Sequence, residues 1–106
     1  MKTEATAQQF ITKIQTQHSK ANHNCWAYRI FTPDGIIPNE SDDGEPNGTA
    51  GQPILYVLQK QRIVNTVFVV TRYFGGVKLG KGGLVRAYSK TTSNLLKAIG
   101  KQKFTF

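Results

Sequence analysis

The chain has 106 residues and a mass of 11.8 kDa, which is enough for one domain with a hydrophobic core and too little for two. Its apolar fraction of 39 % and its ten glycines are typical of a globular domain rather than a disordered chain. No apolar run approaches the length of a membrane span, and no apolar segment follows the N-terminal Met-Lys as in a secretory signal. A single cysteine excludes an internal disulfide, and the predicted compartment is the cytoplasm.

The charge of the chain is strongly asymmetric along its length. The formal net charge is +8, but residues 1–45 hold all six Asp and Glu together with four Lys and Arg. Residues 46–106 hold ten Lys and Arg and no carboxylate. Because this part of the chain cannot neutralise its own surface, it favours an anionic partner such as phosphate, RNA or an acidic protein. The alternative is a solvated surface that pairs with the acidic residues 34–45.

The first half of the chain is predicted to hold one helix and one strand. Residues 5–19 repeat apolar side chains at helical spacing, and Thr6 with Gln9 has the spacing of a capping box. The predicted inward face of this helix consists of Ala7, Phe10, Ile11 and Ile14. Residues 25–32 predict a strand, which ends in a Pro-Asp-Gly turn. Residues 38–51 are rich in Gly, Asn and Asp, and they are predicted to form a long polar loop of the kind that often carries function.

The second half is predicted to hold two helices around one strand. A helix covers about residues 53–60, and Thr49 with Gln52 has capping-box spacing before it. Residues 66–74 have a Val-Phe-Val-Val centre, which is typical of an interior strand. A last helix is predicted over residues 84–99. Its predicted inward face consists of Leu84, Ala87, Tyr88, Thr91, Leu95 and Ala98.

Five glycines in residues 75–83 separate the predicted strand from the last helix. Free amide groups and the partial positive charge at a helix N-terminus favour an anion at this position. Gly75 to Lys81 fits Gly-x-x-x-x-Gly-Lys, but Gly82 replaces the Ser or Thr that would hold magnesium, so a nucleotide-hydrolysing loop is rejected. The alternative is a tight turn with close packing. The candidate anion- or nucleic-acid-binding residues are Arg72, Lys78, Gly80, Lys81, Gly82, Gly83, Arg86, Lys90 and Lys97.

Three carboxylates, Asp42, Asp43 and Glu45, cluster before the second predicted helix. They could act as acid or base, hold a cation or dock a basic partner, although their spacing does not match a calcium loop. The structural alternative, which the sequence favours, is that Asp42 or Asp43 caps a turn or pairs with Arg72 or Arg86.

His23 and Cys25 lie one residue apart at the start of the first predicted strand. They would share one face of that strand, which suggests a dyad. Two His and one Cys in the whole chain underfill a zinc site, and a strand cysteine more often serves packing. His23 and Cys25 therefore join the three carboxylates as weak catalytic candidates, and we expect neither a metal nor a cofactor.

Three ordered motifs then point to a known family. The first is His23-x-Cys25-x-Ala27. The second, Ser-Asp-Asp-Gly-Glu-Pro-x-Gly-Thr-Ala-Gly-x-Pro, covers residues 41–53. The third, Arg-Tyr-Phe-Gly-Gly-x-x-Leu-Gly-x-Gly-Gly-Leu-Val-x-Ala-Tyr, covers residues 72–88. With these motifs the chain resembles the IMPACT/YigZ family over about residues 5–100.

The order of the elements predicts a single α+β domain over residues 1–106, a two-layer sandwich with a mixed sheet covered by helices. The resemblance implies a fold similar to domain 2 of ribosomal protein S5. It also implies a link to translation, because eukaryotic relatives regulate translation by binding the activator of an initiation-factor kinase. Bacterial relatives open with an additional strand and continue into a ferredoxin-like domain, and neither is expected within this sequence. An edge strand exposed in this way could pair with a second copy of the chain.

Two functions remain in contention. The favoured one is a non-enzymatic binding domain that contacts RNA or a translation-associated protein through its basic, glycine-rich surface. For RNA we expect salt-sensitive binding to single strands, weakened when Lys78 and Lys81 are replaced by Ala. The alternative is a hydrolytic or phosphate-handling enzyme that uses residues 41–45 opposite Arg72 and the glycine loop.

Overall fold

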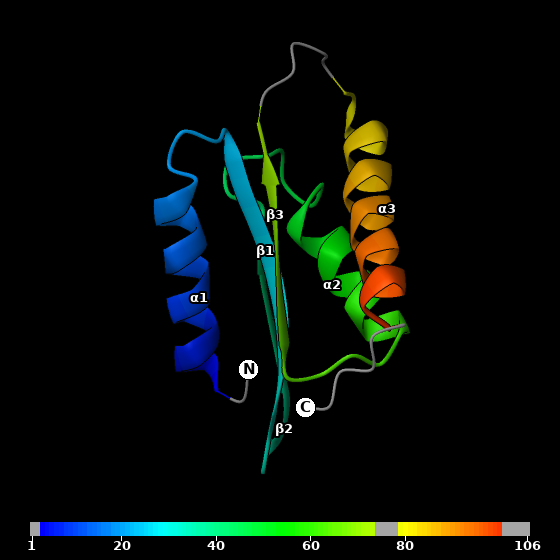
Figure 1. Ribbon diagram of the computed structural model, residues 1–106. Coiled ribbons are helices and arrows are strands. Elements are labelled where there is room, and N and C mark those ends of the chain that lie inside the picture. Colours follow the sequence, from blue (N-terminus) through cyan, green and yellow to red (C-terminus); the bar gives the residue numbers. More distant parts are fainter. Residues whose placement is uncertain (1–2, 74–78, 101–106) are drawn as a thin grey trace.

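The computed structural model describes residues 3–73 and 79–100, which contain three helices and three strands (Figure 1). In chain order these are α1 (Glu4–Gln17), β1 (His23–Thr32), β2 (Gly35–Ser41), α2 (Gly51–Lys60), β3 (Thr66–Arg72) and α3 (Lys81–Gly100). The predicted α+β class is confirmed. Among the described helices, none combines the length and the apolar character that a membrane crossing requires.

The described strands form one sheet in the order β2-β1-β3, and both strand pairs are antiparallel rather than mixed as predicted. A two-residue turn joins β1 to β2, where Thr32 pairs with Gly35 and its hydroxyl donates to the Gly35 carbonyl at 2.7 Å. Gly35 has a φ of +118°, which favours glycine. The prediction of a loop from Pro38 onward was wrong, because residues 38–41 complete strand β2. Pro38 is tolerated there because β2 lies at the edge of the described sheet.

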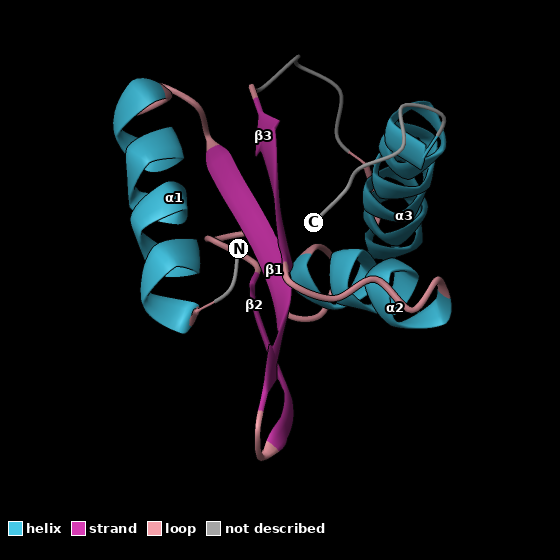
Figure 2. Cartoon of the chain, turned by 60° about the horizontal axis from the view of Figure 1, so that its bottom comes forward, coloured by secondary structure: helices cyan, strands magenta, loops and turns pink. Residues whose placement is uncertain are grey.

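Helices cover both faces of this sheet, so the described residues form three layers rather than the predicted two (Figures 1 and 2). On the α1 side, Tyr28 and Ile30 of β1 pack in one buried cluster with Ala7 and Ile11 of α1. On the opposite side, alternate residues of β1 join α2 and α3 in a second buried cluster, which includes Cys25, Ala27, Ile54, Leu58, Phe68, Leu84 and Tyr88. Since side chains alternate along a strand, β1 contributes to both cores at once.

The helix starts differ from the predicted capping boxes. The hydroxyl of Thr3 accepts a hydrogen bond from the Thr6 amide at 3.1 Å, so α1 begins at Glu4 and Thr6 lies inside it. α2 begins at Gly51, and its N-cap residue Ala50 has no side chain that could cap it. The hydroxyl of Thr49 instead donates to a backbone carbonyl, so neither predicted capping box forms.

Helix α3 begins at Lys81, three residues before the predicted start, and it packs through a single row of side chains. The buried members of this row, spaced four residues apart, are Leu84, Tyr88, Thr92 and Leu96. The prediction that Thr91, Leu95 and Ala98 point inward was wrong, because residues four apart stack on one narrow face of a helix. Leu95 is 44 % exposed as a result, and Ala87 is also exposed.

Strand β3 pairs with β1 on one side, and its other edge meets no further strand within the described residues. A hollow of about 400 Å³ lies along β3, and its walls include Phe10 and Ile14 of α1 and Leu95 of α3. At β3 the described part of the sheet therefore has an open, partly apolar edge, opposite the edge formed by β2.

Candidate functional site

A dense cluster of polar side chains surrounds Glu45, which lies in the loop between β2 and α2. Its side chain is only 2 % exposed. Arg72 at the end of β3 binds it with both prongs of the guanidinium, Nε to Oε2 at 2.7 Å and Nη2 to Oε1 at 3.1 Å. The hydroxyl of Tyr88 on α3 donates to Oε2 at 2.6 Å, and His23 Nε2 lies 3.5 Å from Oε1. Glu45 thus links the loop to β1, β3 and α3.

The electrostatics of this cluster hold Glu45 in its charged form. Burial alone would raise its pKa, but hydrogen bonds from Arg72 and Tyr88 and the nearby His23 hold the pKa below the ordinary value of 4.5. The pKa of Arg72 is raised in turn, mainly by its hydrogen bond to Glu45. Burial raises the pKa of Tyr88, so its hydroxyl remains a donor at neutral pH. A carboxylate with this many donors is a poor proton acceptor for a substrate.

Asp42 holds the start of α2. Its Oδ1 accepts from the amides of Ala50 and Gly51 at 3.1 and 2.8 Å, and its Oδ2 accepts from the Gly48 amide at 2.9 Å. A carboxylate at this place satisfies free amides and complements the positive end of the helix. Asp42 therefore supplies the cap that Ala50 cannot provide.

Asp43 fixes the other end of the loop against β1. Its Oδ2 accepts from the Asn24 amide at 2.7 Å, and its backbone carbonyl lies 2.8 Å from His23 Nδ1. Asp43 and the following Gly44 have φ values of 41° and 89°, a sharp turn that directs Glu45 inward. Asp42 and Asp43 thus accept from backbone amides, and Arg72 pairs with Glu45 and not, as the sequence had suggested, with either Asp.

Cys25 is buried beneath this loop. Its thiol donates to the Asp42 carbonyl at 3.0 Å and lies 3.4 Å from the Tyr88 hydroxyl. Burial and the neighbouring Glu45 raise the pKa of Cys25 to about 12, although the Tyr88 hydrogen bond opposes the shift. Since the thiolate is the nucleophilic form, this cysteine is unreactive at neutral pH.

The structure thus brings all five weak catalytic candidates into one region, but each already has a partner within the fold. Arg72, a candidate for anion binding, is occupied by Glu45. Lys78 lies outside the described residues. Gly80, Lys81, Gly82 and Gly83 lie at the start of α3, where the Leu84 amide donates to the Gly80 carbonyl at 2.9 Å.

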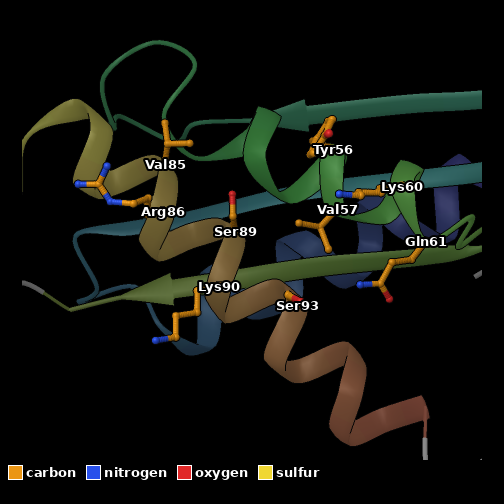
Figure 3. A pocket seen from close by; sticks show the side chains of 9 residues that line it. All are labelled: Tyr56, Val57, Lys60, Gln61, Val85, Arg86, Ser89, Lys90 and Ser93. Atoms are coloured by element: carbon orange, nitrogen blue, oxygen red, sulfur yellow. The ribbon is translucent and has the colours of Figure 1, made fainter.

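The remaining basic candidates lie on α3, where Arg86, Lys90 and Lys97 are all exposed. Arg86 and Lys90 border a groove of about 750 Å³ between α2 and α3 (Figure 3). From α2 the groove is lined by Tyr56, Val57, Lys60 and the following Gln61; from α3 it is lined by Val85, Arg86, Ser89, Lys90 and Ser93. None of these described lining residues is acidic. The sequence predicted the α3 charges but not this groove, since nothing in the pattern of α2 shows which helix packs beside it.

Comparisons with known proteins agree on one family. Residues 1–96 match the family model described as the Impact N-terminal domain. The chain is similar to IMPACT family member YvyE of Bacillus subtilis, with 58 % identity over 92 % of this chain and 45 % of that protein. It is also similar to IMPACT family member YigZ of Escherichia coli, with 39 % identity over 93 % of this chain and 49 % of that protein. The chain therefore spans about half the length of these relatives.

A eukaryotic protein and a solved structure also match the chain. Protein IMPACT of Oryctolagus cuniculus is 32 % identical over 80 % of this chain and 31 % of its own length. A solved structure titled as a hypothetical protein superposes with a TM-score of 0.85 and 38 % identity, over 92 % of this chain and 48 % of that one. The architecture described above is thus shared with an experimental structure.

Proposed function

This chain belongs to the Impact N-terminal domain family, and we propose that its domain is a non-enzymatic module that acts in translation by binding single-stranded RNA along α3. The observation that carries the proposal is the charge of this surface. Every residue from 46 onward is neutral or basic, apart from any charge on the chain end. The exposed Arg86, Lys90 and Lys97 consequently have no acidic neighbour from their own half of the chain.

The geometry of α3 suits a ligand that is recognised through its backbone. At 1.5 Å per residue, Arg86 and Lys90 are about 6 Å apart along the helix axis, and Lys97 follows after about 10 Å more. Contacts to phosphate need charge and spacing but no base code, so binding is expected to be largely independent of sequence. Lys60 on α2 adds a charge on the other side of the same groove.

The enzyme alternative is less well supported by the same geometry. A hydrolase needs a carboxylate or nucleophile that is free to meet its substrate. Here Glu45 is bound by Arg72 and Tyr88, Asp42 caps α2, and Cys25 is buried and protonated. A binding surface therefore accounts for more of the exposed chemistry than an active site does.

The experiment compares two charge-matched variants by fluorescence anisotropy with a labelled single-stranded oligoribonucleotide. Lys90→Gln plus Lys97→Gln removes two charges from α3, and Lys13→Gln plus Lys20→Gln removes two exposed charges from α1 and the turn that follows it. Helices α1 and α3 lie on opposite sides of the sheet (Figure 1). The α3 pair is expected to weaken binding at low salt, and the other pair to leave it within about twofold of wild type. Absence of binding by the wild type at low salt, or equal effects of the two pairs, would overturn the proposal.

A further inference from the structure

We propose that the groove between α2 and α3 holds an unpaired base of the bound RNA, stacked on the ring of Tyr56, while Lys60, Arg86 and Lys90 contact the adjoining phosphates. This inference rests on the proposed function and deepens it. It assigns to the domain a preference for unpaired over paired RNA, which charge alone would not produce.

Tyr56 is the residue on which the base would stack, because it is one of the most exposed aromatic residues in the described part of the chain. Helix α2 turns Ile54, Val57 and Leu58 toward the core, and Tyr56 falls between them on the solvent side. The residue is 61 % exposed. Because more than half of this residue is accessible, its ring can receive a planar partner. Base–aromatic stacking is the usual way in which proteins hold single-stranded nucleic acid without reading its sequence.

The rest of the groove complements a nucleotide in both charge and polarity. Lys60 borders it from α2, and Arg86 and Lys90 extend from α3 (Figure 3). Ser89 and Ser93 on α3 offer hydroxyl groups that can donate to or accept from the edge of a base. The volume of about 750 Å³ lies in the range of about 300–1,000 Å³ that is usual for small-molecule sites.

The lining favours a nucleic acid over an acidic amphipathic peptide. A peptide helix in a groove buries several apolar side chains along a continuous strip. Apart from Tyr56, the apolar lining consists of two valines, Val57 and Val85, and Val57 is already 92 % buried in the core. One open ring among serines and long basic side chains fits a base with its phosphates better than it fits such a strip.

Stacking on Tyr56 requires that the bound base is not stacked between its neighbours in the RNA. A base within a duplex is stacked between its neighbours, and it must leave that stack, at a cost, before it can meet Tyr56. A base in a single strand leaves its stack at a much lower free-energy cost, so we expect the groove to bind single strands more tightly than duplexes.

The experiment measures the affinity of Tyr56→Ala, Tyr56→Phe and Phe31→Ala for a single strand and for a duplex of the same length, at several salt concentrations. Phe31 is the matched control, because it is 60 % exposed on the β1–β2 hairpin outside the groove. Tyr56→Ala is expected to bind the single strand about 5- to 150-fold more weakly than wild type, because it loses the contact with one stacked base. The affinities of Tyr56→Phe and Phe31→Ala should stay within about twofold of wild type, because Tyr56→Phe keeps the stacking ring and Phe31 lies outside the groove. The salt slope of Tyr56→Ala should equal that of wild type, because no phosphate contact is removed.

The outcomes separate this inference from the proposed function. Wild-type binding to the single strand with no change in Tyr56→Ala overturns the groove inference and leaves the proposed function standing. Absence of wild-type binding overturns both. Tighter binding of an acidic peptide than of RNA in the same assay also overturns the inference, because it assigns the groove to a protein. Thermal unfolding followed by circular dichroism establishes that each variant is folded, and the Tyr56→Phe result distinguishes loss of the ring from loss of the hydroxyl.

Discussion

Replacing Glu45 with Gln is expected to destabilise the domain strongly, because this side chain joins the loop of residues 42–50 to three other elements. The substitution preserves shape but removes the charge that binds Arg72 at 2.7 and 3.1 Å. Breaking a buried ion pair from one side costs about 3–5 kcal/mol. The side chain of Arg72 is 25 % exposed and can be partly hydrated, so we expect a lower cost of about 2–4 kcal/mol.

The assay is urea unfolding at pH 7, followed by circular dichroism. A loss of 2–4 kcal/mol is a large share of the about 5–15 kcal/mol that stabilises a typical domain. Each kcal/mol lowers the melting temperature of a domain of this size by about 4–8 °C, so the melting temperature should fall by roughly 8–32 °C. A Glu45→Gln variant within about 0.5 kcal/mol of wild type would refute the view that this cluster holds the loop in place.

The matched control is Glu40→Gln, because the pKa of the Glu40 carboxyl is shifted in the opposite direction from that of Glu45. Burial and the nearby Asp42 raise the pKa of Glu40, and its Oε2 is buried without a hydrogen-bond partner among the described residues. At pH 7 this substitution should be neutral or stabilising, because it removes a charge that the folded state disfavours.

The pH dependence of stability provides a second test of the same cluster. The pKa of Glu45 is lower in the folded than in the unfolded chain, so its contribution is complete above the ordinary value of 4.5. That contribution disappears as the pH falls through the folded-state pKa. The difference in unfolding free energy between wild type and Glu45→Gln should therefore be constant near neutral pH and shrink below about pH 4.5. A difference that grows on acidification would contradict this sign.

Three further predictions concern packing, the thiol and the sheet edge. Gly51→Ala should cost about 1–3 kcal/mol by the same urea assay, because its new Cβ would lie 2.9 Å from the backbone N and C of Ser41. Gly80→Ala should cost less, because its new Cβ would meet no atom of the described residues within 4 Å and only the preference for glycine at the start of α3 is lost. Labelling of Cys25 by a thiol reagent at pH 8 should be slow until urea unfolds the chain, since its pKa of about 12 leaves little thiolate; rapid labelling of the folded protein would contradict its burial. Sedimentation should show concentration-dependent dimers through the open edge of β3, and a monomer at high concentration would dismiss that interface.

The helices and two of the strands could be predicted from the sequence, because their apolar periodicity is strong. Strand β2 could not, since an edge strand with exposed Ile36 and a central Pro38 lacks the alternating pattern. Its existence depends on pairing with β1, which is a tertiary effect. The inward face of α3 was predicted too broadly for a similar reason: periodicity selects a side of the helix, but the neighbouring α2 and sheet decide how wide the buried row is.

The Glu45 cluster shows which features of the site can be predicted from the spacing of residues in the sequence and which cannot. The sequence predicted that Asp42 or Asp43 caps a turn or pairs with Arg72 or Arg86, and it gave no sign that Glu45 would turn inward to Arg72 instead. This inward turn depends on the positive φ values of Asp43 and Gly44 and on Tyr88, which approaches from a helix 43 residues away. Asp42 likewise caps α2 from outside the sequence window in which a cap is normally sought.

The salt dependence of RNA binding shows whether α3 contacts phosphates. The logarithm of the binding constant is measured against the logarithm of salt concentration for wild type and for Lys90→Gln plus Lys97→Gln. We expect a linear decrease for wild type and a slope that is smaller in magnitude by about 1.4 for the variant, since each phosphate contact to a single strand contributes about 0.7. Identical slopes for the two proteins, or no binding at low salt, would contradict the proposal that α3 binds RNA.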